Sequence, residues 1–205
     1  MTDPGITGQL RPVFRFFLTL FLLPAIGSPT PAQAGYCEDL WFTRNAVMDR
    51  AGICFGSPLG QAVFDNTGCI GASVQPSPAF AQLIAQFNQA EQIAGCRVDT
   101  SQTFLDLKDL SIRQRLVTLP IPEDRGQGFG CIGWRGAALP LRDTNAQQGA
   151  VIGQIDPGDS VYFFHIPADG WSYVTTEGAG RVGLKSGGWM PAGFDSQSMC
   201  AQQAG

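Results

Sequence analysis

Histidine is nearly absent from this sequence: among 205 residues there is one, His165. A single imidazole allows at most one Cys/His or Ser/His catalytic pairing. No two cysteines have the C-x-x-C spacing, so the chain also lacks the usual ligand pattern of a structural zinc site. The G-x-S-x-G, H-E-x-x-H and Gly-rich phosphate-loop motifs are missing as well. We therefore expect no metal, no other cofactor and no enzymatic activity.

Charged residues are also scarce, at 15% of the sequence, but some carboxylates lie close together in the chain. Asp106 with Asp109, and Glu123 with Asp124, are the pairs that we consider. Two carboxylates are the minimum that a glycosidase requires, so a hydrolase built on carboxylates stays a hypothesis. Such pairs more commonly form solvated faces or helix caps, and we interpret them in that way.

Long apolar runs are limited to one, at residues 16–26, which is too short to cross a bilayer. It follows Arg11 and Arg15 and precedes Ala32-Gln33-Ala34, which has the small residues that a signal peptidase reads. We predict a signal peptide over residues 1–34, in preference to a membrane anchor.

Removal of this leader would leave 171 residues with 11 Lys and Arg against 16 Asp and Glu, a formal charge of −5. A surface of that sign argues against non-specific nucleic-acid binding. We expect a periplasmic or secreted protein with no nucleic-acid partner and no membrane span after cleavage. Its abundant Gly, Pro and Phe suit a compact, loop-rich fold.

All six cysteines follow the predicted cleavage site, at Cys37, Cys54, Cys69, Cys96, Cys131 and Cys200. An even number in an exported chain predicts three disulfides. A helix over residues 38–51 would hold Cys37 and Cys54 about 20 Å apart, beyond the roughly 7 Å that a disulfide spans. For an up-down-up arrangement of three helices, we predict the pairs Cys37–Cys69, Cys54–Cys96 and, by elimination, Cys131–Cys200.

Apolar residues at helical spacing predict helices over residues 38–51, 59–66 and 78–94. The third is the best defined, with Ser77 as its N-cap and Gly95 directly after it. Arg44 interrupts the apolar stripe of the first helix. Its guanidinium needs a buried partner, for which Asp65 is our candidate, or it extends along the stripe to water.

The first helix and the residues after it carry a recognisable pattern. Arg44-Asn45 comes first, then Met48–Gly52 with Arg50 and Gly52, and Phe55, Leu59 and Phe64 follow at apolar positions. This order resembles the YARHG domains, presumed extracellular modules of bacteria, although the Tyr, the His and the closing Trp-Tyr are missing. The resemblance implies a location but no activity. We interpret Arg50, Gly52 and Phe55 as a structural corner that ends the helix.

From Cys131 onward the pattern is typical of short β-strands separated by tight turns. We expect strands at residues 139–142, 151–155, 160–165, 171–175 and 188–190. Many short strands of this kind favour a small barrel. The Pro- and Gly-rich residues 119–130 before it predict a linker and a domain boundary.

The same region resembles the bacterial SH3 domains. Leu139–Arg142, Val151–Val161, Trp171–Val174 and Gly188–Met190 match four of their elements in order. The resemblance implies a barrel that binds peptidoglycan or a short peptide through aromatic faces. We take Trp134, Tyr162, Trp171 and Tyr173 as candidate ligand-binding rings, the alternative being that they form the core.

The sequence thus predicts an α+β protein: a small disulfide-linked helical domain at residues 35–98, a connecting segment at 99–130 and an SH3-like β-barrel at 131–200. We expect an exported, non-enzymatic binding protein of the bacterial cell envelope, whose partner is a cell-wall glycopeptide or an extracellular peptide. The alternative is an interaction, inhibitor or accessory module for another exported enzyme.

Overall fold

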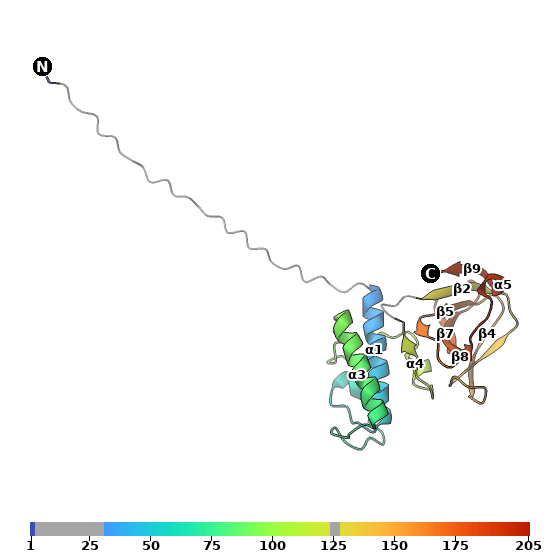
Figure 1. Cartoon of the computed structure of the whole chain (residues 1–205), viewed down its shortest axis with the longest axis horizontal. Helices are drawn as coiled ribbons and strands as arrows, with labels where there is room; N and C mark the ends of the chain where they lie inside the picture. Colours follow the sequence, from blue (N-terminus) through green and yellow to red (C-terminus); the bar gives the residue numbers. More distant parts are fainter. Residues whose placement is uncertain (3–30, 124–127) are drawn as a thin grey trace.

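The computed structural model describes residues 1–2, 31–123 and 128–205. The predicted leader falls almost entirely outside these ranges. Helices precede strands along the chain, and Figure 1 shows the helical part on one side of the molecule and the sheet on the other. The expected α+β class with disulfides is therefore confirmed. In the described ranges, no helix is both long and apolar enough to cross a membrane.

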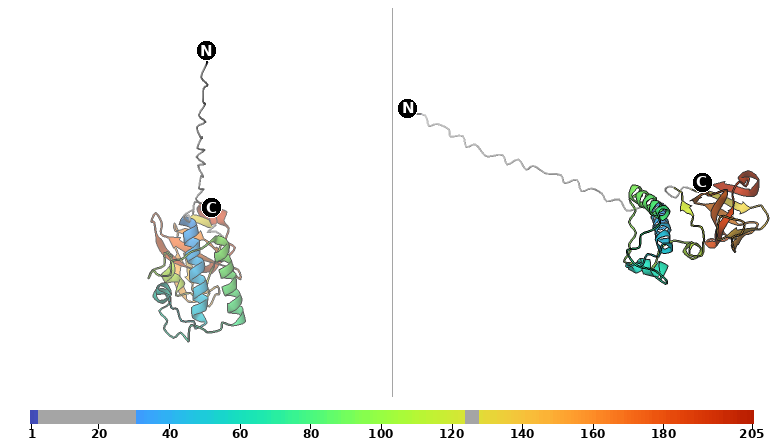
Figure 2. Two further views of the ribbon diagram at one scale, coloured as in Figure 1. Left: turned by 90° about the vertical axis from the view of Figure 1, so that its left-hand side faces the viewer. Right: turned by 60° about the horizontal axis from the view of Figure 1, so that its bottom comes forward.

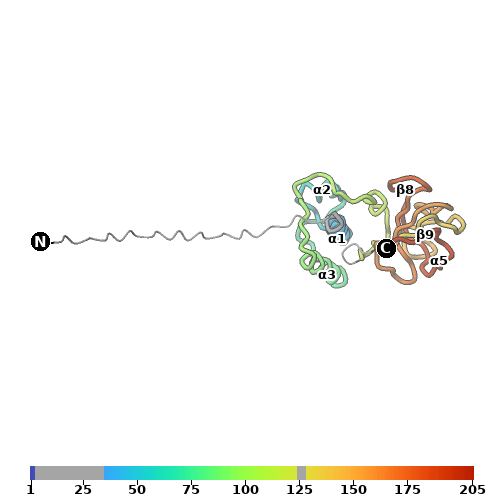
Figure 3. The backbone as a smooth tube through the Cα atoms, turned by 90° about the horizontal axis from the view of Figure 1, so that it is seen from above, coloured from blue at the N-terminus to red at the C-terminus, as the bar shows by residue number. Residues whose placement is uncertain are grey.

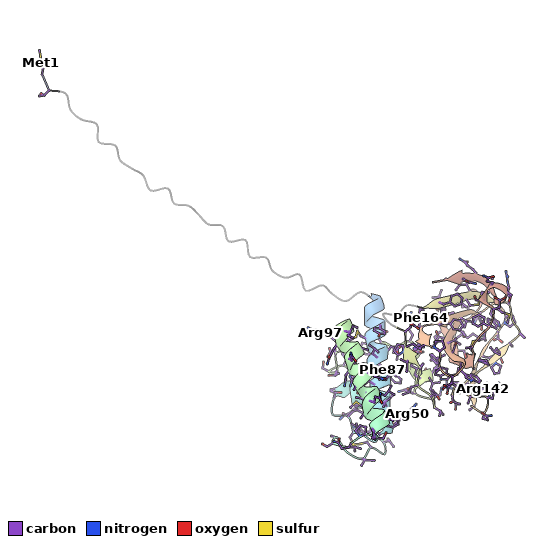
Figure 4. All side chains as sticks on the ribbon, viewed as in Figure 1. Met1, Arg50, Phe87, Arg97, Arg142 and Phe164 are labelled. Atoms are coloured by element: carbon purple, nitrogen blue, oxygen red, sulfur yellow. A yellow bond between two sulfur atoms is a disulfide. The ribbon has the colours of Figure 1, made fainter. Side chains whose placement is uncertain are left out.

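Two long helices form the helical part. They are α1 (Pro31–Arg50) and α3 (Pro78–Ala94), which lie side by side, and a short α2 (Pro58–Phe64) lies at one end of them (Figures 1 and 2). The Ser77 hydroxyl accepts a hydrogen bond from the backbone N–H of Phe80, and Gly95 ends α3 with a left-handed φ of 65°. Tyr36, Leu40 and Val47 of α1 pack against Phe87 of α3, which is labelled in Figure 4.

Two of the three predicted disulfides are wrong. The bonds are Cys37–Cys96 and Cys54–Cys69, in place of Cys37–Cys69 and Cys54–Cys96. The up-down-up arrangement fails because α2, with 7 residues, does not return along the length of α1. Cys69 therefore stays beside Cys54, and α3, with 17 residues, carries Cys96 back to Cys37. Cys131–Cys200 is confirmed.

Residues 95–123 link the two parts and pack against both. They contain the short helix α4 (Leu110–Arg113) and the strand β1 (Ile121–Pro122). Leu105 packs with Trp41 and Leu59 of the helical part, whereas Leu116 packs with Trp189 of the sheet. This segment, expected as a connection, is thus a structural layer, and α4 is visible between the helices and the sheet in Figure 1.

Within the described ranges, the C-terminal part forms a seven-stranded antiparallel sheet in the order β4-β3-β8-β7-β5-β2-β9. The strands that were expected are β3 (Leu139–Arg142), β4 (Val151–Ile155), β5 (Ser160–Phe163), β7 (Trp171–Glu177) and β8 (Leu184–Pro191). Two more, β2 (Phe129–Trp134) and β9 (Cys200–Ala204), extend the sheet, with α5 (Ser196–Met199) directly before β9. The end of the expected third-strand region, β6 (His165–Ile166), leaves the sheet and pairs with β1.

Residues from all seven strands share one core, so the sheet curves around it. Trp134, Leu141, Ile155, Val161, Val174, Met190 and Cys200 are its members from successive strands. The edge strands β4 and β9 have no hydrogen-bonded pairing with each other, however, so the sheet is not closed into a barrel. The sheet is confirmed, and the SH3-like closed barrel is not.

Candidate functional site

The structure buries two of the four rings predicted to bind a ligand. Trp134 is 3% exposed, and its indole N–H donates to the Ala137 carbonyl oxygen, 3.0 Å away. Tyr173 is 0% exposed. Neither ring presents a face to solvent. Trp134 packs in the core inside the curved sheet, whereas Tyr173 lies on the opposite face of the sheet and packs with Leu116 and Trp189.

The other two predicted rings lie apart from each other. Trp171 is half-buried against the cluster of Leu116, Tyr173 and Trp189. Tyr162 is half-buried on β5, stacks on Phe164 with ring centroids 6.1 Å apart, and donates its hydroxyl proton to Glu177 Oε2 at 3.0 Å. The four rings therefore form no single patch, and Tyr162 alone borders the site described below.

The residues of the YARHG-like pattern have structural contacts. The Arg44 Nε–H donates to Glu91 Oε1 at 3.0 Å, so the predicted Asp65 partner is wrong. Asp65, directly after α2, instead accepts a hydrogen bond from the Thr67 N–H. The Asn45 amide donates to the Trp41 carbonyl oxygen within α1.

The corner after α1 is built by the other members of the pattern. Arg50 donates to the carbonyl oxygens of Leu116 and Val117 at 2.6 and 2.8 Å, which ties the end of α1 to the connecting segment. Gly52 has a φ of 84°, a left-handed conformation that favours glycine, and a Cβ there would crowd the exposed side chain of Ile70. Phe55 is 8% exposed and stacks on Phe64.

A buried charge network joins the helical part to the sheet. Arg113 of α4 has a side chain that is 0% exposed and donates to both carboxylate oxygens of Asp39 at 2.5 and 2.6 Å. Its Nε–H donates to Asp109 at 3.0 Å, and Asp109 also accepts from the Tyr173 hydroxyl at 2.8 Å. His165 contacts both Arg113 and Asp39 through Nε2. Five residues from four segments thus meet at one point.

The charges in this network hold one another ionised. Burial alone would raise the pKa of Asp39, but the guanidinium of Arg113 and the neighbouring His165 outweigh it and lower that pKa to about 2. Burial works against the charge on Arg113, and Asp39 and Asp109 overcome it and raise its pKa. Burial, then the charge of Asp109, raises the pKa of Tyr173 well above its ordinary value. The network is therefore a fixed structural unit at neutral pH.

A cavity of about 710 Å³ opens beside this network. Its walls come from the start of α1, the residues around α4, the end of β1, and the strands β5 to β8. Figure 3 shows the yellow-green connecting segment running between the helical part and the sheet, and Figure 4 places Phe164 between the two parts. The volume of the cavity falls within the roughly 300–1,000 Å³ that is typical of small-molecule sites.

Two buried oxygen atoms that line the cavity have no hydrogen-bond partner in the described part of the protein. They are Thr176 Oγ1, in a residue that is 0% exposed, and Glu38 Oε2. Burial, together with the charge of Asp106, raises the pKa of Glu38. Buried polar atoms without partners are rare in native proteins and cost free energy. A bound group with hydrogen-bond donors that reaches Glu38 would satisfy its carboxylate.

Metal binding finds no support in the described ranges, where no three His, Cys, Asp or Glu side chains gather to hold an ion. Sequence reasoning missed Arg113 as the central cation, and it missed Thr176 entirely. Arg113 lies four residues after Asp109, with Leu110 and Leu116 three positions to either side, which is a signal of a buried i, i+4 pair. Thr176 carries no sequence signal, since its role depends on the cavity around it.

Two family models match the chain. The YARHG domain matches residues 21–92, which confirms the N-terminal resemblance, and the Domain of unknown function (DUF4453) matches residues 95–205. The extracellular type of the YARHG domain and the three disulfides agree with a location outside the cytoplasm. Searches of curated proteins and of solved structures found no match. Because the second model covers more than half of the sequence, the chain belongs to the family Domain of unknown function (DUF4453).

Proposed function

We propose that this protein is an exported, non-enzymatic binding protein of the bacterial cell envelope, periplasmic or secreted, that holds a peptide or a peptide-bearing cell-wall fragment. The binding site is the cavity between the helical part and the sheet. It replaces the aromatic face of an SH3-like barrel as the place of binding. The likeness of residues 139–190 to SH3 domains agrees with a peptide ligand but does not locate it.

One observation carries this proposal: the 710 Å³ cavity is lined by two buried oxygen atoms without partners, Thr176 Oγ1 and Glu38 Oε2. The fixed charge network beside them holds the two walls together without a ligand. A preformed site of this kind loses little conformational entropy on binding. The one imidazole, on His165, already contacts Arg113 and Asp39 within the network, which favours binding over catalysis.

Sedimentation with insoluble peptidoglycan tests this function. The mature protein should pellet with the wall material, and Leu184→Trp should release it, because Leu184 lines the cavity and the larger ring would obstruct the space that the ligand occupies. Val151→Trp is the matched control, since Val151 is also an exposed strand residue but does not line the cavity. Equal pelleting of Leu184→Trp and the unmodified protein would reject the cavity as the binding site.

A second candidate, an accessory or inhibitor module for another exported protein, is favoured by an apolar pair beside the cavity. Ile121 and Ile166 are register partners in the β1–β6 ribbon, and they are 41% and 44% exposed. If this function holds, the immobilised protein should retain one stoichiometric partner from periplasmic extract. An Ile121→Ser, Ile166→Ser double variant should lose that partner, whereas Leu184→Trp should keep it.

A further inference from the structure

We propose that the cavity recognises a cationic side chain of a peptide, a lysine-type ammonium or a guanidinium on an apolar stem, held by Glu38 and Asp106. This inference rests on the proposed function and names the chemistry of its ligand. It follows from three features of the cavity: its charge, its unpartnered oxygens and its aromatic wall.

Apart from the buried charge network around Arg113, most charged residues that line the cavity are carboxylates. Asp39 and Asp109 are paired with Arg113 and offer no free charge. The other carboxylates among the described lining residues are Glu38, Asp106, Glu123 and Glu177, and Lys108 is the one cation that faces them. An anionic ligand would therefore be repelled, and a cation would be attracted.

The unpartnered oxygens require a donor. A carboxylate accepts hydrogen bonds and cannot donate them, so Glu38 Oε2 is satisfied only by an N–H or O–H group. An ammonium offers three donors and no acceptor. Glu38 and Asp106 line the same cavity, and burial, with a smaller contribution from the charge of Asp106, raises the pKa of Glu38. A cation between them would remove their mutual repulsion.

The remaining walls are apolar and aromatic. Tyr162 and Phe164 stack almost in parallel, at an interplanar angle of 9°, and Phe164 is 42% exposed. With Leu184 they give a surface for a methylene stem, and an aromatic face also attracts a cation within about 6 Å. Charge at one end and apolar contact along the stem is the pattern of a lysine or arginine side chain.

The test uses three pools of acetylated, amidated tripeptides whose central residue is lysine, norleucine or glutamate, with mixed residues on both sides. Norleucine has the length of the lysine stem without its charge. Retention by the full mature protein is measured by equilibrium dialysis and mass spectrometry. We expect the lysine pool to bind about tenfold or more tightly than the norleucine pool, as for other charge-assisted contacts, and the glutamate pool to show no binding. Binding should also weaken as salt is raised.

Variants of the protein distinguish a failure of the cationic-ligand proposal from a failure of the cavity as the binding site. Glu38→Gln with Asp106→Asn should weaken lysine-pool binding to the level of the norleucine pool. Asp49→Asn, a carboxylate at the far end of α1 that does not line the cavity, should leave it unchanged. Norleucine or glutamate binding as tight as lysine binding, and still lost in Leu184→Trp, would overturn the cationic ligand and leave the cavity function standing. No binding of any pool, or binding that survives Leu184→Trp, would overturn both.

Discussion

At the scale of single residues, Arg113 determines how the two parts of the protein meet. Its side chain is fully buried, and it binds Asp39 through two nitrogens and Asp109 through a third. A buried ion pair contributes little net stability compared with apolar packing, but removal of one partner leaves an uncompensated charge. Arg113 also stacks near the rings of Phe42 and Tyr173 at 5.9 and 5.6 Å. Another side chain at position 113 would therefore lose the ion pairs, the ring contacts or both.

Arg113→Met should lower the free energy of unfolding by about 3–5 kcal/mol, because Asp39 and Asp109 are then buried without their cation. Urea unfolding at pH 7 measures this loss. Arg115→Met, two residues along the same segment at an exposed position, is the control and should change stability by less than about 0.5 kcal/mol. A loss no larger than that of the control would show that the network does not hold the interface.

The low pKa of Asp39 makes part of the stability pH-dependent. Its pKa is about 2 in the folded protein against an ordinary value of 3.8, so the ionised carboxylate stabilises the fold above about pH 4. As the pH falls towards 2, this contribution of about 2 kcal/mol is lost. Asp39→Asn should therefore be less stable than the unmodified protein at pH 5, and the gap should narrow by about 2 kcal/mol at pH 2.

Urea titrations at a series of pH values measure that gap. Asp169→Asn is the control, since Asp169 is exposed and its left-handed φ of 51° suits asparagine. Its curve should run parallel to that of the unmodified protein. A gap between Asp39→Asn and the unmodified protein that stays constant from pH 5 to pH 2 would contradict the assignment of the low pKa to Asp39.

The residues of the site were the least predictable from sequence. Arg44 stood out because it breaks an apolar stripe, yet its partner is Glu91, which the sequence gives no reason to prefer over Asp65. The rings of Trp134 and Tyr173 could be named, but Trp134 is buried by the curvature of the sheet and Tyr173 by the connecting segment that packs on the other face. Patterns within one element predict which residues are unusual. They do not show which distant residues will meet.

At the scale of elements, local signals placed the helices well. Ser57 and Ser77 each cap the helix that follows, and prolines occupy the first positions of α2 and α3. The error lay in how the helices are arranged, because the short second helix was expected to return Cys69 towards Cys37. Its 7 residues span only about 10 Å, at 1.5 Å per residue. A helix of that length leaves Cys69 beside Cys54, which exchanges the partners of two disulfides.

The two helical disulfides should differ in their effect on stability. Cys37–Cys96 closes a loop with a sequence separation of 59, and Cys54–Cys69 one of 15. In the chain-entropy description, these constrain the unfolded chain by about 4 and about 3 kcal/mol. Replacing both cysteines of the longer loop by serine should therefore destabilise the protein by about 1 kcal/mol more than the same change in the shorter loop. Thermal and urea unfolding of the two double variants measure the difference, and the reverse order would contradict the loop argument.

At the scale of the whole molecule, the helical part and the sheet are coupled by few but strong contacts. Arg113 joins Asp39 of α1 to His165 and Tyr173, Arg50 ties the end of α1 to the connecting segment, and Leu116 of that segment packs against Trp189. Trp41 lies in the helical core, whereas Trp134, Trp171 and Trp189 belong to the sheet. Sequence patterns predicted two parts but not this coupling, since it depends on residues 99–123, which have weak patterns of their own.

Unfolding in urea should be a single transition in the unmodified protein, with coincident curves from far-ultraviolet circular dichroism and tryptophan fluorescence. In Arg113→Met the two curves should separate, because the helical part, stapled by two disulfides, and the sheet lose their link. Arg115→Met should keep them coincident. Separate transitions already present in the unmodified protein would show that the two parts fold independently.

The bond between Cys131 and Cys200 has a consequence for resistance to proteolysis. It encloses nearly the whole sheet, from β2 to the start of β9, including the exposed turn at residues 178–183. A protease that nicks the chain at that turn would produce two fragments still fastened to each other. The nicked protein would migrate as one band in gel electrophoresis until a reductant is added. Its strands would remain paired in the sheet, because the disulfide keeps the two fragments together.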